Sequence, residues 1–205
     1  MARIAVISDT HGILPEAAFR LFNGDWSEDE LADSIITGAN VTYDDDGTIA
    51  FGPMPPAELK PTKANLIIHA GDIGPQLVLD ELGAIARTVA VLGNNDYERY
   101  WCSDGDVLDY RSLTFDGVDI FVQHIPREME ASLKGRLPLQ PALVKTQPAL
   151  AIHGHTHVPR LETNGRRITL CPGSPTRARD GSGHAAALID TESGRIARAA
   201  LIRLP

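Results

Sequence analysis

The chain of 205 residues is poor in cysteine and has no excess of positive charge. Its two cysteines, Cys102 and Cys171, lack the spacing of a zinc site and are too few for a disulfide scaffold. A reduced, cytoplasmic setting is therefore expected. The formal net charge of −8 repels nucleic-acid backbones, so no stable nucleic-acid binding is expected. Phosphate substrates remain compatible with this charge where metal ions supply positive charge locally.

Long apolar stretches are also missing. No segment approaches the ~20 consecutive apolar residues that a membrane-spanning helix needs, so no membrane partner is expected. The N-terminal apolar run, residues 2–8, is too short for a signal peptide and lacks a cleavage site. The length and the 43% share of hydrophobic residues instead predict a single globular domain over residues 1–205.

Strand-like and helix-like segments alternate in the first half, which predicts a largely parallel sheet. The predicted strands there are 2–8, 65–72 and 88–96, and the predicted helices are 15–22 and 75–87. The second half adds predicted hairpins at 112–124, 160–171 and 185–204, a strand at 148–157, and short helices at 127–134 and 140–146. The whole pattern predicts an α/β fold, in which a two-sheet β-sandwich is flanked by helices.

Residues 23–64 interrupt this regular pattern with acidic clusters and prolines. Within them, residues 40–52 predict a hairpin with an Asp-Gly turn. We interpret the segment as a surface insertion. It follows the helix after Asp9 and His11, so it could lie near their site and shape the access of substrate. An oligomer contact or a solvated flap is an equal alternative.

Metal-capable side chains follow five of the predicted strands, at the point where each strand ends. In open α/β sheets, sites form beyond the carboxyl ends of the strands, so side chains far apart in sequence can converge there. These residues are Asp9 with His11, Asp72, Asn94 with Asp96, His124, and His155 with His157.

The residue types indicate what such a site would bind. Carboxylates and neutral imidazoles are ligands for borderline divalent metals such as manganese, iron, nickel and zinc. In Asp-x-His and His-x-His pairs, both side chains project the same way from an extended backbone, so each pair can approach one metal or two neighbouring metals. Each motif alone has a simpler explanation as a helix cap, a turn or a structural histidine. Together, at five strand ends, they predict a metal site.

The ordered motifs "SDTHG", "HAGDI", "GNND", "VQH" and "GHTHVP" resemble those of the calcineurin-like metallophosphoesterases, and most closely the small bacterial and archaeal phosphodiesterases. The segment "CPGSPTR" is similar to a segment that follows the last ligands in that branch. The resemblance covers residues 1–22 and about 63–205, and leaves out the insertion at 23–64.

The resemblance implies a site for two divalent transition metal ions per chain. Mn²⁺ is favoured, with Ni²⁺, Co²⁺, Fe or Zn²⁺ as alternatives. His69 and His153 match no ligand of the family, and we expect each to be structural or to lie directly behind the ligands, where His69 could orient one of them. The implied metal ligands are Asp9, His11 and His157 for one ion, Asn94, His124 and His155 for the other, and Asp72 as the bridge.

The function implied by the resemblance is hydrolysis of a small or nucleotide-like phosphoester by a hydroxide that bridges the two metals. A phosphodiesterase is favoured over a phosphomonoesterase, and a homodimer fits the family. The alternative is a catalytically weak, metal-binding scaffold that resembles the retromer subunit of the same fold. Intact residues at all seven ligand positions favour the enzyme.

The chain departs from the family pattern next to the ligands. Asn95 stands where many members have a histidine that touches the phosphate, and an amide cannot supply a proton near neutral pH. We expect Asn95 and Asp96 to act in catalysis, and Asn94, Asn95 and Arg127 to contact substrate. Arg127 follows a ligand motif that lacks its usual second histidine, although a surface arginine is at least as consistent with the sequence.

Overall fold

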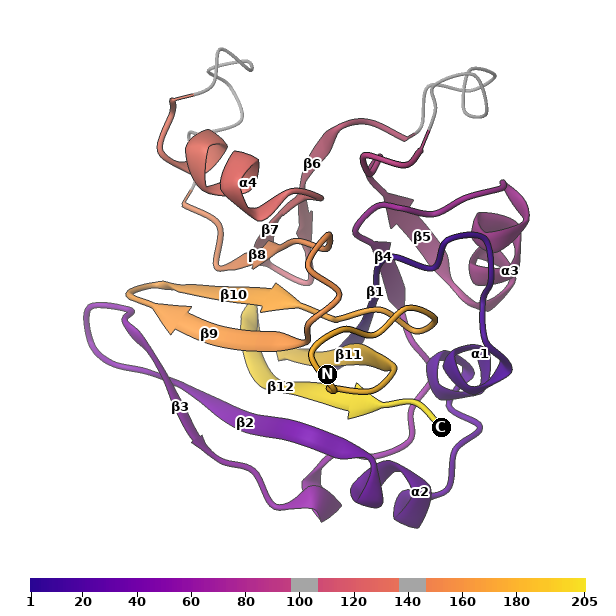
Figure 1. The fold of residues 1–205 in the computed structure, drawn as a ribbon. Helices are drawn as coiled ribbons and strands as arrows, with labels where there is room; N and C mark the ends of the chain where they lie inside the picture. Colours follow the sequence, from indigo (N-terminus) through magenta and orange to yellow (C-terminus); the bar gives the residue numbers. More distant parts are fainter. Residues whose placement is uncertain (97–106, 137–146) are drawn as a thin grey trace.

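The computed structural model describes residues 1–96, 107–136 and 147–205. Two sheets face each other and helices cover the outer faces, as shown in Figure 1, so the predicted two-sheet α/β sandwich is confirmed. The larger sheet has the order β3 (Ile49–Pro53), β2 (Ile35–Tyr43), β12 (Arg195–Arg203), β11 (Ala185–Glu192), β1 (Ala2–Ile7), β4 (Leu66–His69) and β5 (Arg87–Ala90). The smaller sheet has the order β6 (Tyr110–Phe115), β7 (Val118–Gln123), β8 (Leu150–Ile152), β10 (Arg167–Cys171) and β9 (Arg160–Asn164).

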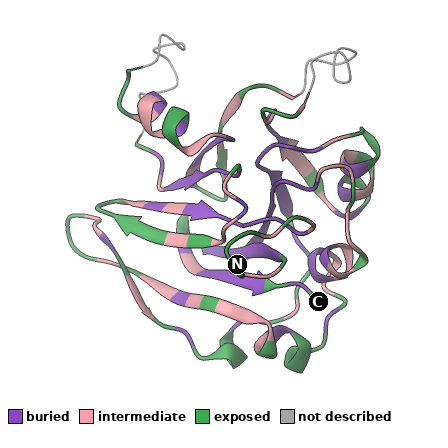
Figure 2. Cartoon of the chain, viewed as in Figure 1, coloured by how far each residue is buried: buried purple, intermediate pink, exposed green. Residues whose placement is uncertain are grey.

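Strand β1 shows how the layers are built. Successive side chains of a strand point to opposite faces, so Ile4 and Val6 enter the core between the two sheets, whereas Ala5 and Ile7 enter the core beneath the helices. All four side chains have no exposed surface. A strand buried on both faces reads as a continuous apolar run, which is why this strand was visible in the sequence (Figure 2).

Helices cover both outer faces of the sandwich. On the larger sheet lie α1 (Glu16–Asn23), α2 (Glu28–Asp33), the short helix η1 (Pro56–Glu58) and α3 (Leu77–Ile85). On the smaller sheet, α4 (Pro126–Leu133) packs Met129 against Phe121 and Ala151. Helix α2 was not predicted, although Ser27 and Glu30 form a capping box that marks its start. The helix predicted at 140–146 lies outside the described residues.

Strand directions bring the functional loops to one edge. Strands β1, β4 and β5 run parallel, as predicted, and so do β7, β8 and β10. The rest of the larger sheet is antiparallel, so the sheet is mixed and the prediction of a largely parallel sheet holds only for three strands. The loops that follow the parallel strands of both sheets meet at one end of the sandwich.

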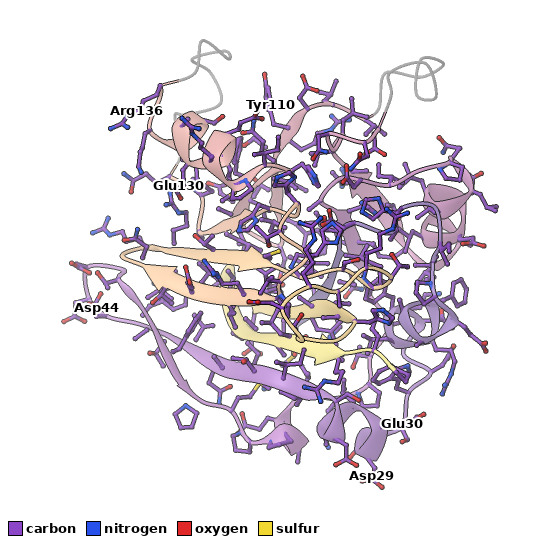
Figure 3. The ribbon with its side chains drawn as sticks, viewed as in Figure 1. Asp29, Glu30, Asp44, Tyr110, Glu130 and Arg136 are labelled. Atoms are coloured by element: carbon purple, nitrogen blue, oxygen red, sulfur yellow. The ribbon has the colours of Figure 1, made fainter. Side chains whose placement is uncertain are left out.

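The segment 23–64 extends the larger sheet and is not a solvated flap. Strand β2 pairs antiparallel with β12, and β3 pairs beyond it at the edge. The Ile49 amide donates to the Gly165 carbonyl in the β9–β10 turn at 2.8 Å, so the hairpin also joins the smaller sheet. Its acidic side chains Asp29, Glu30 and Asp44 point outward (Figure 3). Among the described helices, none is long and apolar enough to cross a membrane.

Candidate metal centre

The structure brings all seven predicted ligands to the strand ends where the two sheets meet. One group consists of Asp9, His11, Asp72 and His157, whose ligand atoms all lie within 4.8 Å of one another. His157 Nε2 is 3.2 Å from Asp9 Oδ1 and 3.4 Å from His11 Nε2. This spacing matches a set of donors that surrounds one small ion.

A second group lies beside the first. Asn94 Oδ1 is 2.8 Å from His155 Nδ1 and 3.2 Å from His124 Nε2. Asp72 lies between the groups, because its Oδ1 is 3.5 Å from His124 Nε2 and its Oδ2 is 3.8 Å from His11 Nε2. The placement of Asp72 is that of a carboxylate able to serve both groups.

The backbone of the cluster is strained. Asp9, His11, Asp72, His155 and His157 all have positive φ, between 48° and 67°. Non-glycine residues rarely adopt this left-handed conformation, and it persists only where the surroundings impose it. The extended backbone expected for the Asp-x-His and His-x-His pairs is therefore wrong. The paired side chains converge because the chain turns sharply at each of these residues.

Glycines let the ligand loops approach one another. A Cβ atom on Gly154 would lie 1.9 Å from Ser8 Oγ and 2.7 Å from Asp9 Oδ2. A Cβ atom on Gly93 would lie 2.2 Å from Asp72 Oδ1. No side chain fits at either position, so these glycines set the distances between the loops.

Backbone carbonyls orient two of the imidazole rings. The Nδ1–H group of His157 donates to the Arg177 carbonyl at 2.6 Å, and that of His124 donates to the Ala70 carbonyl at 2.7 Å. Each bond directs Nε2 of the ring at the carboxylates, so this nitrogen is the one placed to bind a metal. This arrangement is typical of metal-binding histidines, whose second nitrogen is held by an acceptor.

The surroundings of Asp9 show whether the donor set fits a metal ion. Its Oδ2 atom accepts hydrogen bonds from Ser8 Oγ at 2.6 Å and from the His155 amide at 3.0 Å. Its Oδ1 atom is buried and has no hydrogen-bond partner among the described residues. Burial raises the pKa of Asp9, the usual cost of a carboxylate away from water. A divalent cation would complete this oxygen, so the donor set fits such an ion.

The neighbouring charges reinforce this fit. Burial alone would raise the pKa of Asp72, but hydrogen bonds from His124 and Asn95 outweigh burial and hold it below its ordinary value. Burial alone would lower the pKa of His124, but Asp72 and Asp9 raise it. Asp72 is thus ionised, and the position of His124 Nε2 favours positive charge.

Two further histidines support the loops. His69 is fully buried, and its Nε2 lies 2.9 Å from Thr10 Oγ1, while the Gly71 amide donates to its Nδ1. Burial lowers the pKa of His69 to about 3, so the ring is neutral. His153 is also buried and lies 3.0 Å from the Gly154 carbonyl. Both rings contact the loops behind the cluster.

A pocket of about 450 Å³ opens over the cluster. Asn95 lines this pocket and donates two hydrogen bonds to Asp72, one from its backbone amide at 2.8 Å and one from its Nδ2 atom at 2.6 Å. Arg177 and Arg179 were not among the predicted site residues, although Arg177 ends the "CPGSPTR" segment that is similar to the family. The lining residues are His11, Asp72, Asn94, Asn95, His155, His157, Arg177, Ala178 and Arg179.

Two predicted site residues lie elsewhere. Asp96 accepts backbone hydrogen bonds from Ile73, Gly74 and Gly93, so its carboxylate ties two ligand loops together. Arg127 is exposed on α4 and is not among the lining residues. None of these lining residues comes from the inserted segment 23–64, which removes support for a role of that segment in substrate access.

Comparison with known proteins agrees with this geometry. The profile of the calcineurin-like phosphoesterase superfamily domain matches residues 54–194, more than half of the chain. The chain therefore belongs to this superfamily. A probable metallophosphoesterase of Methanocaldococcus jannaschii is 31% identical over 115 residues, which are 56% of this chain and 55% of the relative. The chain thus spans about half the length of that curated relative.

Solved structures share the fold. An archaeal phosphodiesterase has a TM-score of 0.59 and 21% identity, and the match covers 97% of this chain and 99% of that one. The phosphoesterase YfcE of E. coli has a TM-score of 0.56 and 18% identity, covering 99% and 100%. Vps29 of Entamoeba histolytica complexed with Zn²⁺ has a TM-score of 0.59 and 18% identity, covering 96% and 89%.

Proposed function

We propose that the protein is a metal-dependent phosphodiesterase that hydrolyses a small or nucleotide-like phosphoester. The observation that carries this proposal is the buried Oδ1 atom of Asp9, which has no hydrogen-bond partner among the described residues and faces the imidazole of His157. The superfamily and the similarity in fold to an archaeal phosphodiesterase support the same reaction class.

The ligand groups would hold two divalent ions, with Mn²⁺ favoured. Such ions would supply Lewis acidity and lower the pKa of bound water. We assign Asp9, His11 and His157 to one position, Asn94, His124 and His155 to the other, and Asp72 to both. Because Asn94 adds a donor oxygen without charge, the site keeps net positive charge for an anionic substrate.

Asn95 has a positioning role in this proposal. Its two donors hold both oxygens of Asp72 at the pocket wall. An amide can donate a hydrogen bond to a phosphoryl oxygen but cannot protonate a leaving group near neutral pH. The enzyme should therefore depend on esters whose leaving group departs without protonation.

Asn95→His tests this dependence. We expect wild type to cleave aryl phosphodiesters much faster than alkyl ones, and the variant to narrow that ratio by about 10²-fold, the usual contribution of a general acid. The two rates are measured side by side at one metal concentration. An unchanged ratio in the variant would contradict the proposed role of the amide.

The experiment that tests the function begins with metal-stripped protein. Mn²⁺, Ni²⁺, Co²⁺, Zn²⁺ or Mg²⁺ is added singly, and hydrolysis of a bis-aryl phosphodiester is followed beside an aryl phosphomonoester. Asp72→Ala should abolish metal-dependent diester cleavage, whereas Asp80→Ala, an exposed aspartate on α3, should keep it. If the chain binds metal but shows no turnover with any of these ions, the proposal of an enzyme is contradicted and a metal-binding scaffold is favoured.

A further inference from the structure

Arg177 and Arg179 stand at the rim of the pocket, on the loop that follows β10. Both side chains are exposed, and both line the pocket together with the ligand histidines. Among the described residues, no carboxylate lies within ion-pair distance of either guanidinium. Within the described part of the chain, no acidic side chain therefore compensates the charge that these two cations bring to the pocket.

The backbone that carries them is anchored to the metal loops. Ser174 is buried, and its Oγ donates to the Asp9 carbonyl at 2.8 Å while it accepts the Arg177 amide at 2.8 Å. Thr176 Oγ1 donates to the Thr10 carbonyl at 3.1 Å. The Arg177 carbonyl in turn accepts the Nδ1–H group of His157. The main chain is held on both sides, whereas neither guanidinium has a hydrogen-bond partner among residues 1–96, 107–136 and 147–205.

The charge balance of the site indicates what that ligand carries. The ligand set contains two carboxylates, Asp9 and Asp72, and its other donors are neutral when they bind a metal. Two divalent ions would outweigh the carboxylates, and a phosphodiester brings a single negative charge. Arg177 and Arg179 add two more cations to one pocket of a protein whose net charge is −8.

We propose that Arg177 and Arg179 form a second anion subsite, which selects phosphodiesters that carry a further phosphate group on the ester arm that does not leave. This inference rests on the proposed function. A guanidinium presents paired N–H donors that match phosphate oxygens, and such charged hydrogen bonds are about twice as strong as neutral ones. The pocket of about 450 Å³ has room for more than one phosphoryl group.

The test uses the metal-loaded full chain and compares two substrates with the same leaving group. One is propyl p-nitrophenyl phosphate, and the other is 3-(phosphonooxy)propyl p-nitrophenyl phosphate, which carries a phosphate ester at the end of the propyl arm. Release of p-nitrophenolate reports only cleavage of the diester. We expect KM to be at least about tenfold lower for the second substrate, the equivalent of one charged hydrogen bond, with kcat little changed.

Variants assign the preference to the two side chains. Arg177→Ala and Arg179→Ala should each reduce the KM ratio, and the corresponding lysine variants should restore part of it. Arg166→Ala, an exposed arginine in the β9–β10 turn, should keep the full ratio. Equal KM values for the two substrates in wild type, or a ratio that survives both alanine substitutions, would overturn the subsite.

Direct binding separates this inference from the proposed function. If neither substrate is cleaved with any metal, the phosphodiesterase proposal fails. The subsite is then tested by calorimetry, which compares the affinity for propane-1,3-diol bisphosphate with the affinity for propyl phosphate. A bisphosphate affinity at least about tenfold higher, lost in the double alanine variant, would support the subsite. Equal affinities, or an advantage kept in that variant, would overturn it.

Discussion

A buried aspartate lies near each end of strand β1, Asp190 on the neighbouring strand β11 and Asp9 just after β1, and the two have opposite surroundings. Near the N-terminal end, Asp190 accepts from Arg3 Nε at 2.8 Å and from Arg3 Nη2 at 3.0 Å, with Arg198 Nη1 at 3.3 Å. Beyond the C-terminal end, Asp9 keeps one oxygen without a hydrogen-bond partner among the described residues. The chain itself supplies the positive partners of Asp190, whereas a bound cation would complete Asp9.

The backbone follows the same division. Asp9, His11 and Asp72 have left-handed backbones, whereas Arg3 and Asp190 pair in regular antiparallel register within the sheet. Strain of this kind costs about 1–3 kcal/mol for each residue, and it persists only when the surrounding structure imposes it. One end of the sheet thus contributes stability, and the other end uses some of that stability to hold ligands in place.

Asp9→Asn should lower activity and, in metal-stripped protein, raise stability. Activity on a bis-aryl phosphodiester should fall by about 10³-fold or more, because a charged group that stabilises the reaction is lost. In metal-stripped protein, the same variant should raise the free energy of unfolding by about 1 kcal/mol, since it removes an uncompensated buried charge. Urea unfolding with a chelator measures this gain. A clear loss of stability in the metal-stripped variant would break the comparison.

Asp190→Asn should have the opposite effect at the other end. Removing one partner of a buried ion pair leaves the Arg3 guanidinium uncompensated, so we expect a loss of about 3–5 kcal/mol in the free energy of unfolding. Metal affinity, measured by calorimetry on the folded variant, should be unchanged. A large drop in metal affinity would show that the two ends are coupled.

Two glycine substitutions compare the packing at the candidate metal site with the packing on α3. Gly154→Ala should destabilise the protein by about 1–3 kcal/mol and weaken metal binding, because its Cβ atom would meet Ser8 and Asp9. The matched control is Gly83→Ala on α3, where a Cβ atom meets nothing within 4 Å. That variant should gain about 0.5–1 kcal/mol from helix propensity. Thermal unfolding of both variants, with and without metal, separates the effects.

Cys171 is buried behind the ligand loops, where it contacts Thr156. Burial raises the pKa of its thiol to about 11, so little thiolate forms near pH 8. In a Cys102→Ser background, iodoacetamide should modify Cys171 about 100-fold more slowly in the folded protein than in urea, in proportion to the thiolate fraction. Equal rates in the two states would show that the region behind the loops opens readily.

The raised pKa of Cys171 also predicts how the free energy of unfolding depends on pH. The folded state holds the thiol proton more tightly than the unfolded state does, so this contribution to stability is present at lower pH. It is lost as the pH rises from the ordinary thiol value towards about 11, at about 1.4 kcal/mol per pH unit. Cys171→Ala should lack this loss, which urea unfolding of wild type and variant between pH 8 and 10 measures.

Much of the fold could be predicted because its strands are buried on both faces. Such strands read as continuous apolar runs, and the turns between them carry Asp-Gly or Asn-Gly pairs. Helix α2 escaped prediction because its residues are mostly acidic, with one buried side chain, Leu31, so only the capping box of Ser27 and Glu30 marked it. The pairing of β2 with β12 could not be predicted, because register between distant strands depends on tertiary packing.

The candidate site shows a similar limit. The residue types at the strand ends predicted which side chains meet, because a sheet collects the carboxyl ends of its parallel strands. Arg127 was predicted to contact substrate because it follows a ligand motif directly, whereas Arg177 was not among the predicted site residues. The structure instead places Arg127 on the surface of α4, while Ser174 fastens the Arg177 loop to the Asp9 strand end. A contact between residues 165 positions apart leaves no local signal in the sequence.

The sequence by itself determined the alternation of strands and helices, the two-sheet fold and the metal-capable donors, because burial patterns and ligand chemistry are local properties of residue type. Only the tertiary structure decided that the backbones of five donors are left-handed, that the 23–64 segment extends the sheet, and that two arginines face the pocket. These features depend on which distant loops come into contact, and that is decided when the two sheets pack.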